Sequence, residues 1–192
     1  MKKDIILAGV GGQGVLSIAA IIAQAALDKG FTVRQSEVHG MAQRGGAVLA
    51  HLRLSDQVIP GDLVPQGSAD LIISMEILES LRYAAWLSPE GALVTAAEAL
   101  VNIPDYPDIE ELKKTVGSFP RHCILEAERL AREAGLPKAV NMVMVGAAST
   151  FLPLEPEGIE KVINRIFSAK GFSVSGANLR AYRLGRENGS GQ

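Results

Sequence analysis

A glycine-rich turn between a predicted strand and a predicted helix is the feature that most constrains how this chain folds. The apolar run DIILAG, at residues 4–9, is typical of a buried parallel strand. The segment GVGGQGVLS follows at 9–17, and apolar residues then recur at helical spacing up to a stop at Gly30. A second β-rich run, FTVRQSE, covers 31–37. These residues predict a β-α-β unit with a right-handed crossover in a parallel sheet.

The glycines of this turn have the G-x-G-x-x-G spacing of dinucleotide-binding loops. Gly9 and Gly11 permit a tight turn and close approach of a ligand, and Gly14 permits close packing of the helix on the strand. Amide groups at a helix N-terminus favour an anion. Glu37, 23 residues after Gly14, is a candidate for a ribose contact. The pattern leaves two alternatives open, a nucleotide site and a turn that only packs a helix.

A second glycine cluster, SEVHGMAQRGG, occupies residues 36–46, where the second predicted strand ends. Ligands of open α/β sheets bind along this carboxyl edge, which the first turn shares. The cluster combines hydrogen-bonding side chains with flexible backbone at His39, Gln43, Arg44, Gly45 and Gly46. Arg44 is interpreted either as a partner for a phosphate or carboxylate or as one half of an ion pair at a subunit interface. His39 is either a hydrogen-bond donor or a structural loop residue.

The remaining segments predict one α/β domain. One or two further strands are expected at 47–59, and single strands at 70–75 and 92–96, with a turn at 88–91. Helices are expected at 76–87, 108–117, 138–152, 156–167 and 173–189, and segment 121–135 is expected to run from a strand end into a helix closed by Gly135. The prediction is a single Rossmann-like domain over residues 1–187, with a mostly parallel sheet, a helical C-terminal third and a flexible tail at 188–192.

Composition restricts the classes of partner and cofactor. The net charge of −2 gives no general attraction to nucleic acid or to anionic lipid. The longest apolar run, 142–154, is shorter than the roughly 20 residues of a membrane helix. Cys123 is the only cysteine, which excludes an internal disulfide and a cysteine-ligated iron–sulfur cluster or zinc site within this chain. We therefore expect a soluble, cytoplasmic protein.

Several other polar residues are expected to have structural roles. His51 and Arg53 alternate with leucines on a predicted strand and are expected to face solvent or a partner. His122 and Cys123 point to opposite faces of a strand, so we expect no catalytic pair. Asn141 is expected to form a hydrogen bond at the start of its helix. Three methionines are interpreted as packing residues, namely Met41, Met142 and Met144.

Four segments together resemble a known family. They are GVGGQGVLSIAAIIAQAA, QSEVHGMAQRGGAVLAHLRLS, ADLIISMEILESLRYAAWLSPEGALV and NMVMVGAAS. The chain is similar, over most of its length, to the gamma domain of 2-oxoacid:acceptor (ferredoxin) oxidoreductases. Within the family it is most similar to members that act on aryl pyruvates such as indolepyruvate.

The resemblance implies oxidative decarboxylation of a 2-oxoacid with coenzyme A as cosubstrate, giving an acyl-CoA and reduced ferredoxin. Thiamine diphosphate and iron–sulfur clusters perform the chemistry in this family. The chain has no G-D-G…N stretch for thiamine diphosphate, because PGDLVP at 60–65 has Leu63 where glycine is needed. The resemblance therefore implies a large alpha subunit that carries both cofactors and reduces ferredoxin. We expect the present chain to be an obligate subunit, inactive alone, with no catalytic residue and no cofactor of its own.

The role left to this chain is coenzyme A binding, a contact with the large subunit, or both. The candidate residues are Gly9, Gly11, Gly12, Gln13, Gly14, His39, Gln43, Arg44, Gly45 and Gly46. Three alternatives remain: a gamma subunit for pyruvate, 2-oxoglutarate or branched-chain 2-oxoacids, a free-standing NAD-binding protein, and a scaffold that binds no small molecule.

Overall fold

The computed structural model describes residues 1–39 and 45–189. Within them, six strands form one sheet in the order β2-β3-β1-β4-β5-β6. The strands are β1 (Lys2–Val10), β2 (Thr32–His39), β3 (Ala47–Ser55), β4 (Ala69–Ser74), β5 (Leu87–Ala96) and β6 (His122–Leu125). The helices are α1 (Val15–Asp28), α2 (Ile77–Arg82), α3 (Ile109–Val116), α4 (Ala127–Glu133), α5 (Val140–Ser149), α6 (Pro156–Phe167) and α7 (Phe172–Gly189). Short 3-10 turns are η1 (Ala84–Trp86), η2 (Pro137–Ala139) and η3 (Ser168–Lys170).

The predicted fold class is confirmed, with one change in strand order. Strands β1, β4, β5 and β6 are parallel, and the C-terminal third is helical. However, β3 lies between β1 and β2 and is antiparallel to both. The predicted β1-α1-β2 unit therefore joins two strands that have the same direction but are not neighbours. The short connection from β2 to β3 lets these two strands pair as antiparallel neighbours, and the other edge of β3 pairs with β1.

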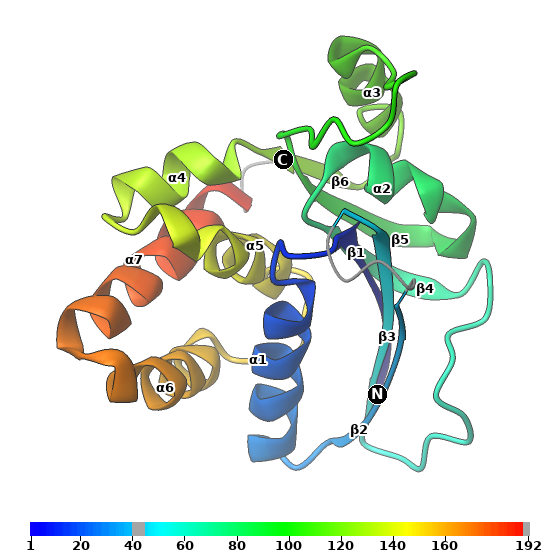
Figure 1. Ribbon diagram of the computed structural model, residues 1–192. Helices are drawn as coiled ribbons and strands as arrows, with labels where there is room; N and C mark the ends of the chain where they lie inside the picture. Colours follow the sequence, from blue (N-terminus) through cyan, green and yellow to red (C-terminus); the bar gives the residue numbers. More distant parts are fainter. Residues whose placement is uncertain (40–44, 190–192) are drawn as a thin grey trace.

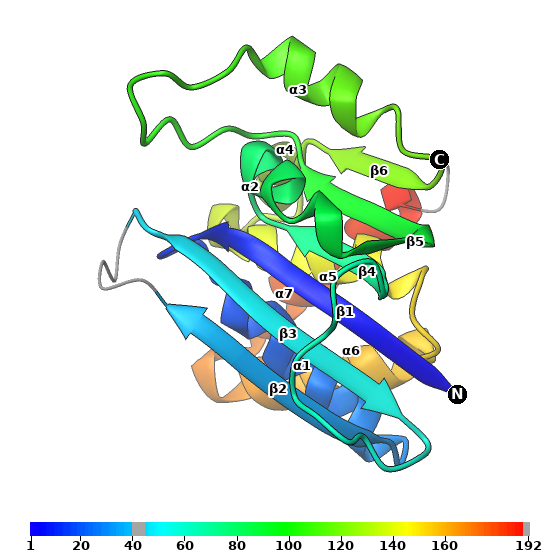
Figure 2. The ribbon, with the colours of Figure 1, turned by 90° about the vertical axis from the view of Figure 1, so that its right-hand side faces the viewer.

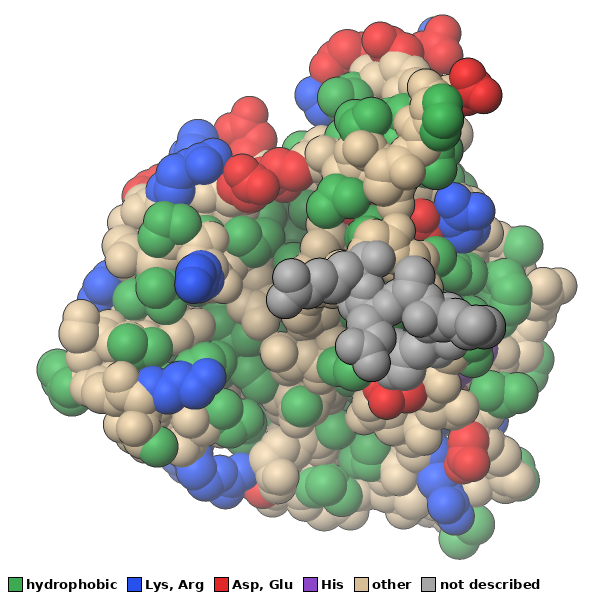
Figure 3. All heavy atoms as spheres, viewed as in Figure 1, with side chains coloured by type: hydrophobic (Ala, Val, Ile, Leu, Met, Phe, Trp, Pro, Cys, Tyr) green, Lys and Arg blue, Asp and Glu red, His purple; other side chains and the backbone are tan. Residues whose placement is uncertain are grey.

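Helices cover the two faces of the sheet unequally (Figure 1, Figure 2). Helices α1, α4, α5, α6 and α7 pack on one face, where Ile5 and Leu7 of β1 point. Ile6 points to the opposite face, which α2 and α3 cover over the β4–β6 half of the sheet. Helix α3 projects from the rest of the molecule, with acidic side chains at its outer end (Figure 3). No helix in the described ranges has the length and apolar character needed to cross a membrane.

The tightest helix contact joins α5 to α7. An added Cβ at Gly146 would lie 2.0 Å from the carbonyl oxygen of Tyr182, and one at Gly185 would lie 2.0 Å from that of Val143. Helix α5 is buried from Met142 to Ser149, which confirms Met142 and Met144 as packing residues. Only glycine at these positions lets the two backbones approach this closely.

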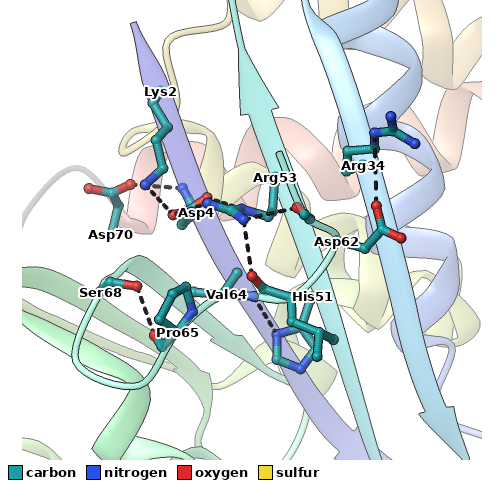
Figure 4. Close-up of polar contacts among 12 residues, drawn as sticks. Lys2, Asp4, Arg34, His51, Arg53, Asp62, Val64, Pro65, Ser68 and Asp70 are labelled. Carbon is teal, nitrogen blue, oxygen red and sulfur yellow. Dashed lines mark hydrogen bonds and ion pairs between the residues drawn. The ribbon is translucent and has the colours of Figure 1, made fainter. Parts of the chain in front are cut away.

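A buried ion pair on the second face corrects the expectation that His51 and Arg53 face solvent or a partner. Arg53 Nε lies 2.8 Å from Asp4 Oδ1, and the Asp4 side chain is inaccessible to solvent (Figure 4). Arg53 Nη1 also donates to the carbonyl oxygens of Gly61 and Leu63, at 2.9 and 3.0 Å. The predicted alternation of side chains between the two faces of β3 is right, but loop 56–68 crosses this face and covers it (Figure 2).

His51 supplies the second anchor for the same loop. Its Nδ1 accepts a hydrogen bond from the amide of Val64 at 3.2 Å, so Nδ1 carries no proton in the folded chain. Burial, followed by the charge of Arg53, lowers the pKa of His51. Together His51 and Arg53 hold loop 56–68 on the sheet.

Several element ends differ from the prediction. Strand β3 ends at Ser55, short of 59. The predicted turn at 88–91 lies within β5, where the register with β4 shifts. The helix expected at 76–87 divides into α2 and η1. Helix α7 continues through Gly189, so it includes the first two residues of the expected tail, and 190–192 lie outside the described residues.

We expect Gly146→Ala to destabilise the chain by about 1–3 kcal/mol, because the new methyl group overlaps the α7 backbone. Gly158→Ala is the matched control, because an added Cβ there meets nothing within 4 Å. In a helix this control change is neutral or stabilises by up to about 1 kcal/mol. Urea unfolding measures both variants. Equal stability of the two would contradict the tight contact between α5 and α7.

We expect His51 to make stability depend on pH. Because the folded state has the lower pKa, the unfolded chain takes up the proton first. The free energy of unfolding therefore falls as the pH drops below about 6.5 and continues to fall until the folded pKa is reached. His51→Asn retains an acceptor for the Val64 amide but does not titrate. Between about pH 7 and pH 5, denaturant unfolding should show a smaller fall in the free energy of unfolding for His51→Asn than for the parent. Parallel pH profiles for variant and parent would show that His51 does not contribute.

Candidate functional site

The first glycine turn connects the carboxyl end of β1 to α1. An added Cβ at Gly9 would lie 2.8 Å from Cγ2 of Val15 and 3.1 Å from Cβ of Met75. Gly14 has φ +84° and precedes the helix, with the Asn141 side chain 3.2 Å from its Cβ position. These two glycines therefore serve packing of α1 and α5 against the strand ends.

Gln13 stabilises the turn from within. Its Oε1 accepts a hydrogen bond from the amide of Val10 at 2.8 Å, and its Nε2 donates to the carbonyl oxygen of Met75 at 3.3 Å. The side chain thus ties the ends of β1 and β4 together. Both polar atoms of the Gln13 side-chain amide therefore have backbone partners. The sequence pattern alone did not indicate that Gln13 joins the two strand ends.

The two glycine clusters lie at one edge of the sheet, as predicted, and they are also hydrogen-bonded to each other. The amide of Gly11 donates to the carbonyl oxygen of Gly46 at 2.8 Å, and the amide of Gly45 donates to that of Gly11 at 3.4 Å. Gly12 is exposed and has φ +101°, and no atom of the described residues lies within 4 Å of its Cβ position. The backbone at Gly12 is therefore open to another molecule.

The rest of the second cluster is only partly described. His39 ends β2 at the same edge of the sheet. Gln43 and Arg44, with Met41, lie outside the described residues. The predicted contacts of Gln43 and Arg44 therefore stay predictions.

Glu76 is a buried residue of this edge that the sequence analysis missed. Its side chain is 1% exposed and accepts hydrogen bonds from the amides of Glu79 and Leu100, at 2.8 and 3.2 Å. It also accepts a hydrogen bond from the hydroxyl of Tyr106, whose pKa is raised by burial and then by this contact. A glutamate placed directly after the buried strand 70–75 was the available signal. Glu76 thus fixes the segment that follows β5.

The strand order disfavours a dinucleotide site. Glu37 is paired with Ala50 of β3, which in turn is paired with Leu7 of β1. Two strand spacings, roughly 9–10 Å, therefore separate the Glu37 backbone from β1. In a dinucleotide-binding fold the acid ends the strand adjacent to the glycine turn. The ribose contact proposed for Glu37 has the wrong geometry for a nucleotide held at Gly11 and Gly12.

The surroundings of the other polar residues singled out from the sequence indicate structural roles. Cys123 is fully buried, and burial raises the pKa of its thiol to about 11. His122 Nδ1 lies 2.7 Å from the carbonyl oxygen of Phe119, which agrees with the expectation that His122 and Cys123 form no pair. The expected hydrogen bond of Asn141 is present, because its Oδ1 accepts from the amide of Met142 at 3.1 Å. Among the described residues, no three His, Cys, Asp or Glu side chains are grouped to hold a metal ion.

Comparisons of sequence support the resemblance across nearly the whole chain. Residues 4–188 match the pyruvate ferredoxin/flavodoxin oxidoreductase family. The indolepyruvate oxidoreductase subunit IorB of Thermococcus kodakarensis is 40% identical, over 96% of this chain and 95% of the relative. The 2-oxoglutarate synthase subunit KorC of Archaeoglobus fulgidus is 30% identical, over 98% of this chain and 88% of the relative.

Solved structures have the same fold. The pyruvate oxidoreductase subunit PORC of Thermotoga maritima superposes with a TM-score of 0.72 at 27% identity, covering 97% of this chain and 96% of that one. The 2-oxoglutarate:ferredoxin oxidoreductase of Magnetococcus marinus, with 2-oxoglutarate, coenzyme A and succinyl-CoA bound, superposes with a TM-score of 0.80 at 21% identity. The present chain is matched over its whole length and spans 31% of that longer chain. By full-length sequence match and by fold, the chain belongs to the pyruvate ferredoxin/flavodoxin oxidoreductase family.

Proposed function

We propose that this chain is the small, non-catalytic subunit of a complex that oxidatively decarboxylates aryl pyruvates such as indolepyruvate. The products are an aryl-acyl-CoA and reduced ferredoxin. The observation that carries the proposal is the contrast in sequence identity, 40% to an indolepyruvate oxidoreductase subunit and 30% to a 2-oxoglutarate synthase subunit. Both matches extend over nearly the full chain, so the contrast is not due to a shorter alignment.

The proposal assigns thiamine diphosphate and the iron–sulfur clusters to a large partner subunit. This chain has one cysteine, and that thiol is buried in the core. In the segment PGDLVP, Oδ1 of Asp62 lies 3.8 Å from Nε of Arg34. The carbonyl oxygens of Gly61 and Leu63, on either side of Asp62, accept hydrogen bonds from Arg53. Neither Cys123 nor this segment fits the cofactors. When bound in the partner, thiamine diphosphate supplies the electron sink for decarboxylation.

In this proposal the small subunit contributes to the complex the edge of its sheet at which the parallel strands end. The paired glycine segments present main chain without bulky side chains, and the open left-handed backbone at Gly12 suits close approach of a phosphate or of another backbone. We propose that coenzyme A or the large subunit contacts this edge. The contact residues of this proposal are Gly11, Gly12, His39, Gln43, Arg44, Gly45 and Gly46. Gly9, Gln13 and Gly14 support the contact through the packing described above.

The purified chain alone should not decarboxylate indolepyruvate or phenylpyruvate, because it encodes neither cofactor site. Co-expression with its cognate large subunit should give a stable complex that reduces a viologen dye when aryl pyruvate and coenzyme A are supplied. Activity of the isolated chain would contradict the proposal, as would full activity of the large subunit without it. A complex that strongly prefers pyruvate or 2-oxoglutarate would overturn the assignment of an aryl pyruvate as substrate and leave the family assignment intact.

The matched variants Gly12→Ala and Gly30→Ala test the glycine contact. Both glycines have a left-handed backbone, at φ +101° and +88°, and open space at the Cβ position. Each substitution should therefore cost a similar amount of stability, about 1 kcal/mol. Only Gly12→Ala should impair the assembled enzyme, because only its methyl group lies at the proposed contact.

The two possible contacts give different results for Gly12→Ala. A raised KM for coenzyme A in an intact complex indicates a coenzyme A contact, and weaker subunit association indicates a partner contact. If Gly12→Ala matches Gly30→Ala in both measurements, the glycine edge has neither role.

A further inference from the structure

The segment that follows β5, together with the first residues of α3, exposes apolar side chains at the same sheet edge. We call residues 98–111 the ledge. Its exposed apolar residues are Leu100, Val101, Ile103 and Ile109. Val101 has 68% of its surface exposed, and the other three have 37–39% exposed. Several such residues within one short segment are more than the scattered apolar exposure that is normal for a protein surface.

The ledge is held in a defined position by the buried carboxylate of Glu76. As described above, Glu76 accepts hydrogen bonds from the Leu100 amide and the Tyr106 hydroxyl. Asn102 Nδ2 also donates to the carbonyl oxygen of Gly45 at 2.9 Å. The ledge is therefore preformed and directly joined to the paired glycine segments, so a molecule that contacts one lies beside the other.

The charge of the ledge restricts what can cover it. Residues 98–111 contain five carboxylates and neither Lys nor Arg. Glu110 forms an ion pair with Lys113 at 2.7 Å, whereas in the described part of the chain Asp105 and Glu111 form none. Figure 3 shows hydrophobic side chains over the α3 region, with acidic side chains along its outer rim. The ledge is thus an apolar surface with an acidic border.

We propose that the large subunit docks on the ledge through an apolar surface bordered by Lys and Arg. The inference rests on the proposed function, because that function supplies the partner. A second copy is disfavoured, since two-fold pairing would place acidic borders against each other. Nucleic acid is disfavoured, because its phosphates would be repelled. A basic border on the large subunit would instead be complementary to the ledge and would speed association.

The experiment measures binding of the co-expressed large subunit to immobilised full-length chain. The ledge variant Val101→Ser with Ile103→Ser should raise the Kd about tenfold or more. The matched control is Val58→Ser with Phe172→Ser, which changes two residues exposed by 88% and 95% away from the ledge. The control should bind as the parent does. Thermal unfolding of each isolated variant verifies that it folds.

A charge variant gives a second, independent measurement. Asp105→Lys with Glu111→Lys leaves the apolar residues in place, and it should slow association and reduce its dependence on salt. If the parent binds the large subunit but both ledge variants bind equally well, the inference is overturned and the proposed function stands. If the parent chain does not bind the large subunit, the proposed function fails. Loss of self-association in the ledge variants, with unchanged binding of the large subunit, would assign the ledge to a second copy and overturn the inference.

Discussion

The close contact of α5 with α7 organises one whole side of the molecule. Helix α5 packs between the sheet and α7. Gly146 and Gly185 allow the two helix backbones to approach so closely that a methyl group at either position would overlap the other helix. This places the start of α5 against the first glycine turn, where Asn141 lies beside Gly14. The C-terminal third of the chain thus supports a turn formed by its first residues.

The carboxyl edge is built mainly from backbone. The segments after β1, β4 and β5, with the residues before β3, meet there through main-chain hydrogen bonds and through three side chains, Gln13, Glu76 and Asn102. Each of these side chains holds a loop in place. An edge with fixed loops and open glycine backbone suits recognition of a phosphate or a protein partner, and this agrees with a subunit that supports chemistry performed elsewhere.

Local pattern predicted much of the fold, and long-range contacts account for what it missed. Helices 156–167 and 173–189 were predicted almost to their ends, and the first of them has strongly amphipathic apolar spacing. The placement of both glycine clusters at one edge of the sheet followed from the rule that parallel strands end at the same edge. The burial of Arg53 did not follow, because it depends on Asp4, 49 residues away, and on a covering loop without regular structure. The role of Glu76 depends on Leu100 and Tyr106, which no local pattern connects to it.

The anchoring of loop 56–68 has a consequence for local unfolding. Three of its backbone groups, at Gly61, Leu63 and Val64, are held by only two side chains, both from β3. Local opening of the loop therefore requires release of these hydrogen bonds together with exposure of the buried Ile59 and Val64 side chains, and it need not disrupt β3 itself. Detachment exposes the Asp4–Arg53 pair to water, which offsets part of the lost hydrogen bonding. The Val64 amide thus reports loop opening by hydrogen exchange, independently of global unfolding.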